Sequence, residues 1–326
     1  MGAASLTVAR HRETFYWLFF TPLWIFPLCL AIFGMYSPLA LMFYYQLVFR
    51  LPHFFMTYVI LQSRNFFRRN NFFKILRYFG PPLLIILLVL GAGYFDQRIP
   101  RYFILGTFIL GFYHNSAQAM GLSLMFLAFK DQSIVRAVKA AFLCLYFISL
   151  EPMIVFAFRV DGFFPSWLLL SLKIIFSVLV SYVIIRVYRK EKNFKFFFYF
   201  ISSIAVLFPW SFYQNYLQQF FVHNLHHSIN YLGIGIAGIA KSEINVFKDF
   251  KPTKIYLICL GLSVSIGLFF QPELMRLKNT FGFINCFFFI HYYVESIMWK
   301  DPELDLKKIP LFEVWKSKFR LSSDGL

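Results

Sequence analysis

Residues 163–185 read FFPSWLLLSLKIIFSVLVSYVII, and residues 79–95 read FGPPLLIILLVLGAGYF. The first run contains a single charged residue, Lys173, and the second contains none. A helix that crosses the hydrocarbon core of a bilayer needs about 20 mostly apolar residues. Hydrophobic residues make up 59% of the chain of 326 residues and charged residues only 14%, which is too apolar for a soluble domain of this length. The sequence therefore predicts an integral membrane protein.

About ten runs of this kind follow one another along the chain. They span approximately 15–35, 37–62, 79–95, 102–129, 138–158, 163–185, 195–210, 211–240, 255–271 and 279–299. With these boundaries, 25 of the 32 lysines and arginines flank one side of the membrane and five flank the other. The positive-inside rule assigns the richer side to the cytoplasm. We expect an all-α, multi-pass transmembrane helix bundle in the bacterial inner membrane, with a cytoplasmic N-terminus (1–14), a helical domain (15–299) and a cytoplasmic tail (300–326).

The formal net charge of +17 is explained by this topology, supported by anionic membrane lipids. Nucleic acid is not needed as a partner. The four cysteines, Cys29, Cys144, Cys259 and Cys286, occur singly within apolar runs. Their spacing predicts neither a disulfide framework nor a zinc–thiolate site.

Six of the seven histidines fall inside the expected spans, where an ionisable side chain needs a partner, a ligand or water. At a rise of 1.5 Å per residue, five of them lie in one layer about 18–24 Å from the outer surface. His223 and His227, one turn apart, can bind one ion from the same helix, and imidazoles from other helices can complete the site. The predicted metal ligands are His53, His114, His223 and His227, with His291 as a fifth ligand or as a replacement for one of these. The alternative is a set of separate histidines, each hydrogen-bonded between packed helices.

Two further residues are candidate catalytic groups beside the ligands. Glu295 lies one turn after His291, where it can orient an imidazole or form an ion pair with Arg50. His226 points about 100° away from His227 on the same helix and would support the site indirectly. Nitrogen donors without thiolates suit iron, copper or zinc, and open positions would suit ferrous iron with dioxygen. We therefore expect non-haem Fe2+ as the cofactor.

Four short stretches carry a resemblance to a known family. They are Leu-Pro-His-Phe-Phe around His53, Phe-Tyr-His-Asn around His114, His-Asn-Leu-His-His at 223–227, and Ile-His-Tyr-Tyr-Val-Glu around His291. In order and spacing they resemble the membrane-integrated carotene dioxygenases of the Brp/Blh-like family. The resemblance implies a histidine-ligated non-haem iron that uses dioxygen to split an apolar substrate, such as a carotenoid, drawn from the bilayer. The chain departs from the family pattern where an Asp is usual, at Thr57, Ala119 and Glu295, and in Phe54, which replaces a Gly.

The same residues are also compatible with three other functions. His-x-x-His-His at 223–227 resembles one histidine box of the membrane lipid desaturases and hydroxylases, although those enzymes use several boxes near the cytoplasmic surface. Polar residues at mid-membrane depth also occur in transporters, where they bind substrate or relay protons. Histidines on facing helices can ligate haem in an electron-transfer protein. The expected function is a membrane oxygenase with non-haem iron, and these three remain its alternatives.

Overall fold

In the computed structural model, the described part of the chain is almost entirely helical. The structure describes residues 51–63, 66–69, 71–96, 98–127, 131–158, 162–191, 194–209, 216–239, 254, 257–262, 265 and 280–298. None of these residues lies in a strand, so the all-α fold class is confirmed. Their helices are α3 (Leu51–Ser63), α4 (Phe66–Arg69), α5 (Phe72–Phe95), α6 (Arg98–Met125), α7 (Gln132–Phe158), α8 (Ser166–Glu191), α9 (Phe194–Leu207), α10 (Tyr216–Ile239) and α13 (Thr280–Met298).

The chain divides into two compact units whose segments alternate along the sequence. The first unit contains the described residues of Phe43–Gly111 and Ser228–Trp315, and the second contains those of Phe112–His227. Both boundaries fall inside continuous helices, one in α6 and one in α10. Each of these two helices therefore contributes one segment to each unit.

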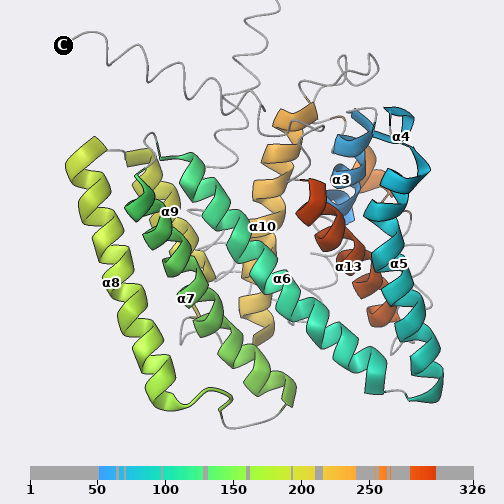
Figure 1. Cartoon of the computed structure of the whole chain (residues 1–326), viewed down its shortest axis with the longest axis horizontal. Helices are drawn as coiled ribbons and strands as arrows, with labels where there is room; N and C mark the ends of the chain where they lie inside the picture. Colours follow the sequence, from blue (N-terminus) through green and yellow to red (C-terminus); the bar gives the residue numbers. More distant parts are fainter. Residues whose placement is uncertain are drawn as a thin grey trace, which may run out of the picture. The chain divides into compact units, whose positions relative to one another are not determined.

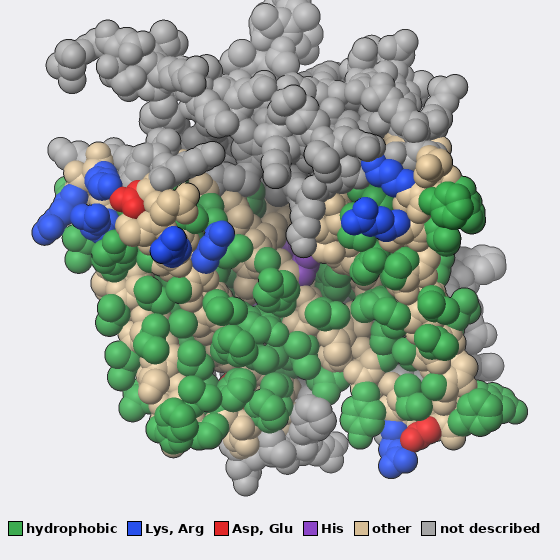
Figure 2. Space-filling view, viewed as in Figure 1, with side chains coloured by type: hydrophobic (Ala, Val, Ile, Leu, Met, Phe, Trp, Pro, Cys, Tyr) green, Lys and Arg blue, Asp and Glu red, His purple; other side chains and the backbone are tan. Residues whose placement is uncertain are grey.

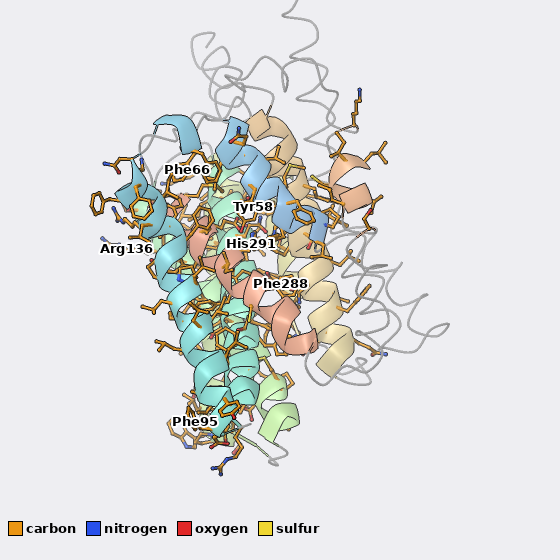
Figure 3. All side chains as sticks on the ribbon, turned by 90° about the vertical axis from the view of Figure 1, so that its right-hand side faces the viewer. Tyr58, Phe66, Phe95, Arg136, Phe288 and His291 are labelled. Carbon is orange, nitrogen blue, oxygen red and sulfur yellow. The ribbon has the colours of Figure 1, made fainter. Side chains whose placement is uncertain are left out.

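The first unit is organised around α13, which packs against α5 and α3 (Figure 1). The side chains of Phe288, Val294 and Met298 on α13 are buried in this packing. These three side chains follow the spacing of one helix face, and His291 lies between them along α13. The packing of this face therefore holds His291 inside the unit. His291 lies along the middle part of α13 in Figure 3.

Polar caps fix the ends of the long apolar helix α5. At its start, Asn71 Oδ1 accepts a hydrogen bond of 3.0 Å from the backbone N–H of Lys74. The first N–H groups of a helix have no partner within the helix, so this bond stabilises the helix start. After its last turn, Asp96 forms an ion pair with Arg98 at 2.9 Å. The polar residues at both ends mark where the apolar span begins and stops.

The second unit contains α7 packed against α8 and α9, which lie side by side in Figure 1. Asp131, just before α7, accepts a hydrogen bond of 2.9 Å from the backbone N–H of Ser133. Its other carboxylate oxygen lies 2.5 Å from Nζ of Lys190, in the last turn of α8. The bonds from Lys190 and Ser133 hold the pKa of the Asp131 carboxyl well below its usual range. This pair joins the start of α7 to the end of α8.

Three of the described helices are long and apolar enough to cross a membrane, at Phe72–Phe95, Gln132–Val155 and Ser166–Lys190. The helices at Phe72–Phe95 and Ser166–Lys190 bury only a small part of their side chains inside the protein. On α8 the exposed side chains include Leu170, Ile174 and Val178. Figure 2 shows apolar side chains covering the middle of α8, with Lys and Arg gathered at its end. This distribution is consistent with a membrane protein.

The predicted topology has about ten spans, whereas the described helices include three candidate spans. Described helices occupy most of the expected spans from 79–95 to 211–240 and the span 279–299. The helices α6 and α10 nevertheless fall outside the three candidate spans, because buried polar side chains interrupt their apolar residues. The run 15–35, the first half of 37–62, most of 255–271 and both termini lie outside the described residues. The number of spans and the side on which each terminus lies remain predictions.

Candidate metal centre

Two helices of the first unit bring two histidines and a carboxylate together. His53 Nε2, on α3, lies 2.7 Å from His291 Nε2, on α13. Glu295 Oε2 lies 3.1 Å from the same His291 nitrogen, one helical turn further along α13. His53 is 2% exposed, and His291 and Glu295 are each 1% exposed. Three donor atoms thus converge in a place that excludes bulk solvent.

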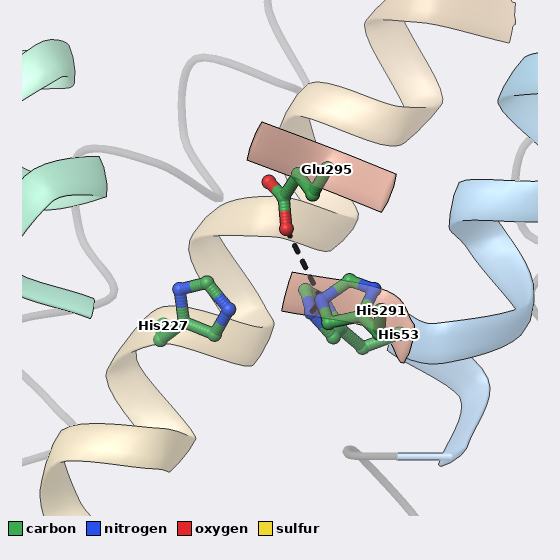
Figure 4. A group of neighbouring side chains, drawn as sticks. All are labelled: His53, His227, His291 and Glu295. Carbon is green, nitrogen blue, oxygen red and sulfur yellow. Dashed lines mark hydrogen bonds and ion pairs between the residues drawn. The ribbon is translucent and has the colours of Figure 1, made fainter. Parts of the chain in front are cut away.

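A fourth donor belongs to His227, on α10. His227 immediately precedes Ser228 of the first unit, and the helix continues unbroken from it to Tyr231 one turn later. The ligand atoms of His53, His227, His291 and Glu295 all lie within 4.8 Å of one another (Figure 4). His227 is also buried. Among the described residues, these four form the group whose side chains could hold a metal ion.

The donor set fits a single transition-metal ion. Imidazole nitrogens and carboxylate oxygens bind such ions at about 2.0–2.2 Å, so donors on opposite sides of an ion lie about 4.0–4.4 Å apart. The 4.8 Å limit on the group is therefore within a few tenths of an ångström of bonding geometry. A buried carboxylate is unfavourable unless it is protonated, paired or ligated, and a cation at this position would stabilise Glu295. The donor chemistry suits such an ion, and binding it would require the His53 and His291 nitrogens, which lie 2.7 Å apart, to separate by a few tenths of an ångström.

A hydrogen-bond chain reaches the opposite nitrogen of the His291 ring. Thr57 Oγ1, on α3, lies 3.0 Å from His291 Nδ1. The same hydroxyl lies 2.9 Å from the phenol oxygen of Tyr231, on α10. The ring of Tyr231 also meets the ring of His53 edge to face, with centroids 4.2 Å apart. Histidines that ligate metals commonly donate their second N–H to such a partner, which fixes the tautomer and the ring orientation.

The other predicted site residues lie in the second unit and have different neighbours. His114 on α6 faces His227, with ring centroids 4.7 Å apart. His226 lies beside Tyr199, with ring centroids 6.5 Å apart. His223 places Nε2 2.7 Å from the backbone carbonyl of Leu207. The group of four therefore contains three of the five predicted ligands and Glu295, and it does not contain His114, His223 or His226.

The position of His223 has a physical cause at the end of α9. Leu207 is the last residue of that helix, and the final carbonyls of a helix have no partner within it. Its oxygen accepts hydrogen bonds from His223 and, at 2.9 Å, from the hydroxyl of Ser149. His223 donates its Nε2–H to this carbonyl, so that nitrogen is engaged away from the group of four. The i, i+4 spacing of His223 and His227 places them on one helix face without making them share an ion.

Two further residues bear on the sequence predictions. Glu295 was expected to orient an imidazole or to pair with Arg50; its Oε2 lies 3.1 Å from His291 Nε2, and it belongs to the group of possible ligands. Arg50 lies outside the described residues. Tyr231 was not identified, although its place one turn after His227 on a polar helix face was a usable signal.

Comparisons with known proteins add no relative. No family model matches the sequence, and no match was found among curated proteins or among solved structures. The resemblance to the carotene dioxygenases therefore rests on the four histidine stretches alone.

Proposed function

We propose that this chain is a membrane oxygenase whose non-haem iron is held by His53, His227, His291 and Glu295. The observation that carries the proposal is the burial of three imidazoles and one carboxylate whose donor atoms all lie within 4.8 Å of one another. His53, His291 and Glu295 alone supply two imidazoles and one carboxylate, the donor set typical of ferrous oxygenases with open coordination positions. Ferrous iron bound there would supply the activation of dioxygen.

The separation of the two closest histidines favours a bare ion over haem. A haem ligated by His53 and His291 would need its porphyrin plane between their Nε2 atoms, which lie 2.7 Å apart. A diiron site of the desaturase kind would need a second set of ligands. The described residues contain one group of three or more metal-binding side chains within mutual reach. A mononuclear iron centre is therefore better supported than either a haem or a diiron site.

The proposed substrate is an apolar molecule, such as a carotenoid, that enters from the bilayer. The exposed apolar helices support this proposal, because an apolar substrate would dissolve in the same bilayer that such helices would face. The resemblance to the Brp/Blh-like family supports cleavage of a polyene. The protein's own contribution would be to bind this molecule beside the open side of the metal and to exclude water.

Metal analysis tests the centre, and a substrate assay tests the chemistry. Protein purified in detergent should contain about one iron per chain, as expected for a mononuclear site, and its absorption spectrum should lack a Soret band. Reconstituted with ferrous iron in liposomes that contain β-carotene, it should consume dioxygen and the polyene together. A folded protein that binds neither iron nor another first-row metal would overturn the centre. Full occupancy without loss of any polyene would restrict the proposal to metal binding.

We also propose that the chain crosses the bacterial inner membrane about ten times, with both termini in the cytoplasm. The distribution of 25 of the 32 basic residues supports this orientation. The three candidate membrane helices support the membrane location itself.

A further inference from the structure

Thr57 directs its hydroxyl across helices rather than along its own. Buried Ser and Thr side chains in a helix usually bond the carbonyl of the preceding turn. Thr107 does so on α6, where Oγ1 donates to the Phe103 carbonyl at 2.9 Å. On α3, Thr57 instead lies between Tyr231 of α10 and His291 of α13, at 2.9 and 3.0 Å. Its hydroxyl joins three helices at one point.

Burial strengthens the hydrogen bonds of the Thr57 hydroxyl. Thr57 is 1% exposed, Tyr231 is fully buried and His291 is 1% exposed. Hydrogen bonds in a low-dielectric interior are stronger than at a surface, and breaking one leaves a polar group without compensation. The orientation of the His291 ring is therefore coupled to both hydroxyls.

The two nitrogens of His291 face different partners. Nε2 faces His53 Nε2 and Glu295 Oε2, and Nδ1 faces Thr57 Oγ1. A neutral imidazole carries one proton, and a nitrogen can bind a metal only through a free lone pair. If Nε2 is to bind the ion, the proton must lie on Nδ1, where Thr57 accepts it.

We propose that Thr57 and Tyr231 are positioning residues that hold His291 as the tautomer with its proton on Nδ1 and its Nε2 lone pair facing the metal. The inference rests on the proposed metal centre and adds the groups that tune it. Tyr231 fixes the Thr57 hydroxyl through their 2.9 Å bond. Its ring, against His53 at 4.2 Å, also steadies a second ligand.

Four single variants separate positioning from simple packing. Thr57→Val keeps the shape of the side chain and removes the hydroxyl, and Thr57→Ser keeps the hydroxyl. Tyr231→Phe keeps the ring against His53 and removes the phenol oxygen. Thr107→Val is the matched control, because it removes an equally buried hydroxyl from the same unit that bonds only its own helix.

The probe is Co2+ alone, titrated into metal-free protein in detergent and followed by its visible absorption bands. Loss of a partner behind a ligating histidine weakens metal binding about 10- to 100-fold, and we expect that loss in Thr57→Val. Thr57→Ser should restore the affinity and the band positions of the unchanged protein, and Tyr231→Phe should show a smaller loss. A variant with both Thr57→Val and Tyr231→Phe should bind no more weakly than Thr57→Val, because Tyr231 acts through Thr57.

Two outcomes of the Co2+ titration overturn the inference while leaving the metal centre intact. One is unchanged Co2+ affinity and spectrum in Thr57→Val; the other is an equal loss of affinity in Thr107→Val, which would indicate a general structural effect. Nitrogen-15 NMR of the Zn2+-loaded protein in liposomes reports the tautomer directly, because Zn2+ is diamagnetic. It should place the His291 proton on Nδ1, next to Thr57, and a proton on Nε2 would reject the inference. Failure of the unchanged chain to bind Co2+ or Fe2+ would instead reject the proposed function.

Discussion

His53 and His291 are separated by 238 positions in the chain, yet their Nε2 atoms lie 2.7 Å apart. At this distance one ring must donate a proton to the other, so the two imidazoles are not independent. Glu295 lies 3.1 Å from the same His291 nitrogen. A transition-metal ion would replace the shared proton and take a lone pair from each ring. The pair is therefore the centre of the proposed site.

His53→Ala and His291→Ala should each abolish metal binding. Either change removes one donor and leaves the remaining buried polar groups without their partner. Because ligands of one ion act as a unit, the double variant should bind no less metal than either single variant. The measurement is metal per chain after purification and dialysis. Ser149→Ala, which removes a buried hydrogen bond to Leu207 in the second unit, is the control and should keep its metal.

The three candidate membrane helices could be predicted because lipid would impose a simple rule on them. The apolar runs at 79–95, 138–158 and 163–185 coincide with α5, α7 and α8, which are the three candidate spans. Lipid-facing helices need apolar residues on most faces, and such composition is visible in the sequence alone. Composition does not say which helices are neighbours, so the packing of α13 against α5 and α3 could not be predicted.

The candidate site could be predicted in part because ionisable residues are uncommon within apolar runs. That rarity draws attention to His53, His227, His291 and Glu295, together with histidines outside the group of four. The grouping of four depends on how each helix is rotated about its axis and on competing partners. The backbone carbonyl of Leu207 accepts a hydrogen bond from the imidazole of His223. Helical spacing in the sequence does not reveal such a partner. Its effect becomes visible only when α9 and α10 are placed together.

Gly111→Ala should destabilise the first unit. A Cβ at Gly111 would lie 2.8 Å from the Tyr292 phenol oxygen and 3.3 Å from its Cζ, so α6 or the Tyr292 ring must move. Overpacking of this kind costs about 1–3 kcal/mol, measurable as a lower temperature of thermal unfolding in detergent. Tyr292→Phe added to Gly111→Ala should recover part of the loss by removing the closest atom.

The matched control for that substitution is Gly106→Ala, on the same helix. Among the described residues, no atom beyond the neighbouring residues and the helix's own backbone lies within 4 Å of a Cβ built at Gly106, and Ala is favoured over Gly within a helix by about 0.5–1 kcal/mol. This variant should be as stable as the unchanged chain or slightly more stable. Equal losses in both variants would contradict the close approach of Gly111 to Tyr292.

Asp131→Asn should lower stability at neutral pH but not in strong acid. Bonds from Lys190 and Ser133 lower the pKa of the folded Asp131 carboxyl below its unfolded value of about 3.9. A lowered pKa means that the charged carboxylate stabilises the folded state above the unfolded pKa. That contribution disappears as the pH falls through the folded pKa. The unfolding temperatures of the two proteins should differ at pH 7 and converge as the solution is acidified. A difference that stays constant with pH would contradict the role of this charge.

The predicted topology places residue 300 and the segment 272–278 on opposite sides of the membrane. Single cysteines introduced at these positions into a chain lacking its own four cysteines should differ in labelling by an impermeant reagent. In intact bacterial cells we expect labelling at 272–278 from outside, and labelling at position 300 only after the membrane is opened. This follows from the excess of basic residues on the side of the tail. Labelling of both positions from outside would reject an even number of spans with cytoplasmic ends.

The sharpest test compares Glu295→Gln with His223→Ala. If Glu295 is a ligand, replacing its carboxylate with an amide removes the negative charge from the centre and should greatly reduce metal affinity while keeping the shape of the side chain. His223→Ala should instead retain its metal. It loses the 2.7 Å bond to Leu207, and a broken buried hydrogen bond destabilises a protein by about 1–3 kcal/mol.

The ligand set built on the i, i+4 pair of His223 and His227 predicts the reverse result. In that arrangement His223→Ala would lose its metal, and Glu295→Gln would show only a moderate effect through the orientation of an imidazole. Metal content and unfolding temperature, measured on both variants, separate the two sets because each predicts a different variant to be metal-free. Full metal retention in Glu295→Gln together with metal loss in His223→Ala would show that the group of four is not the binding site.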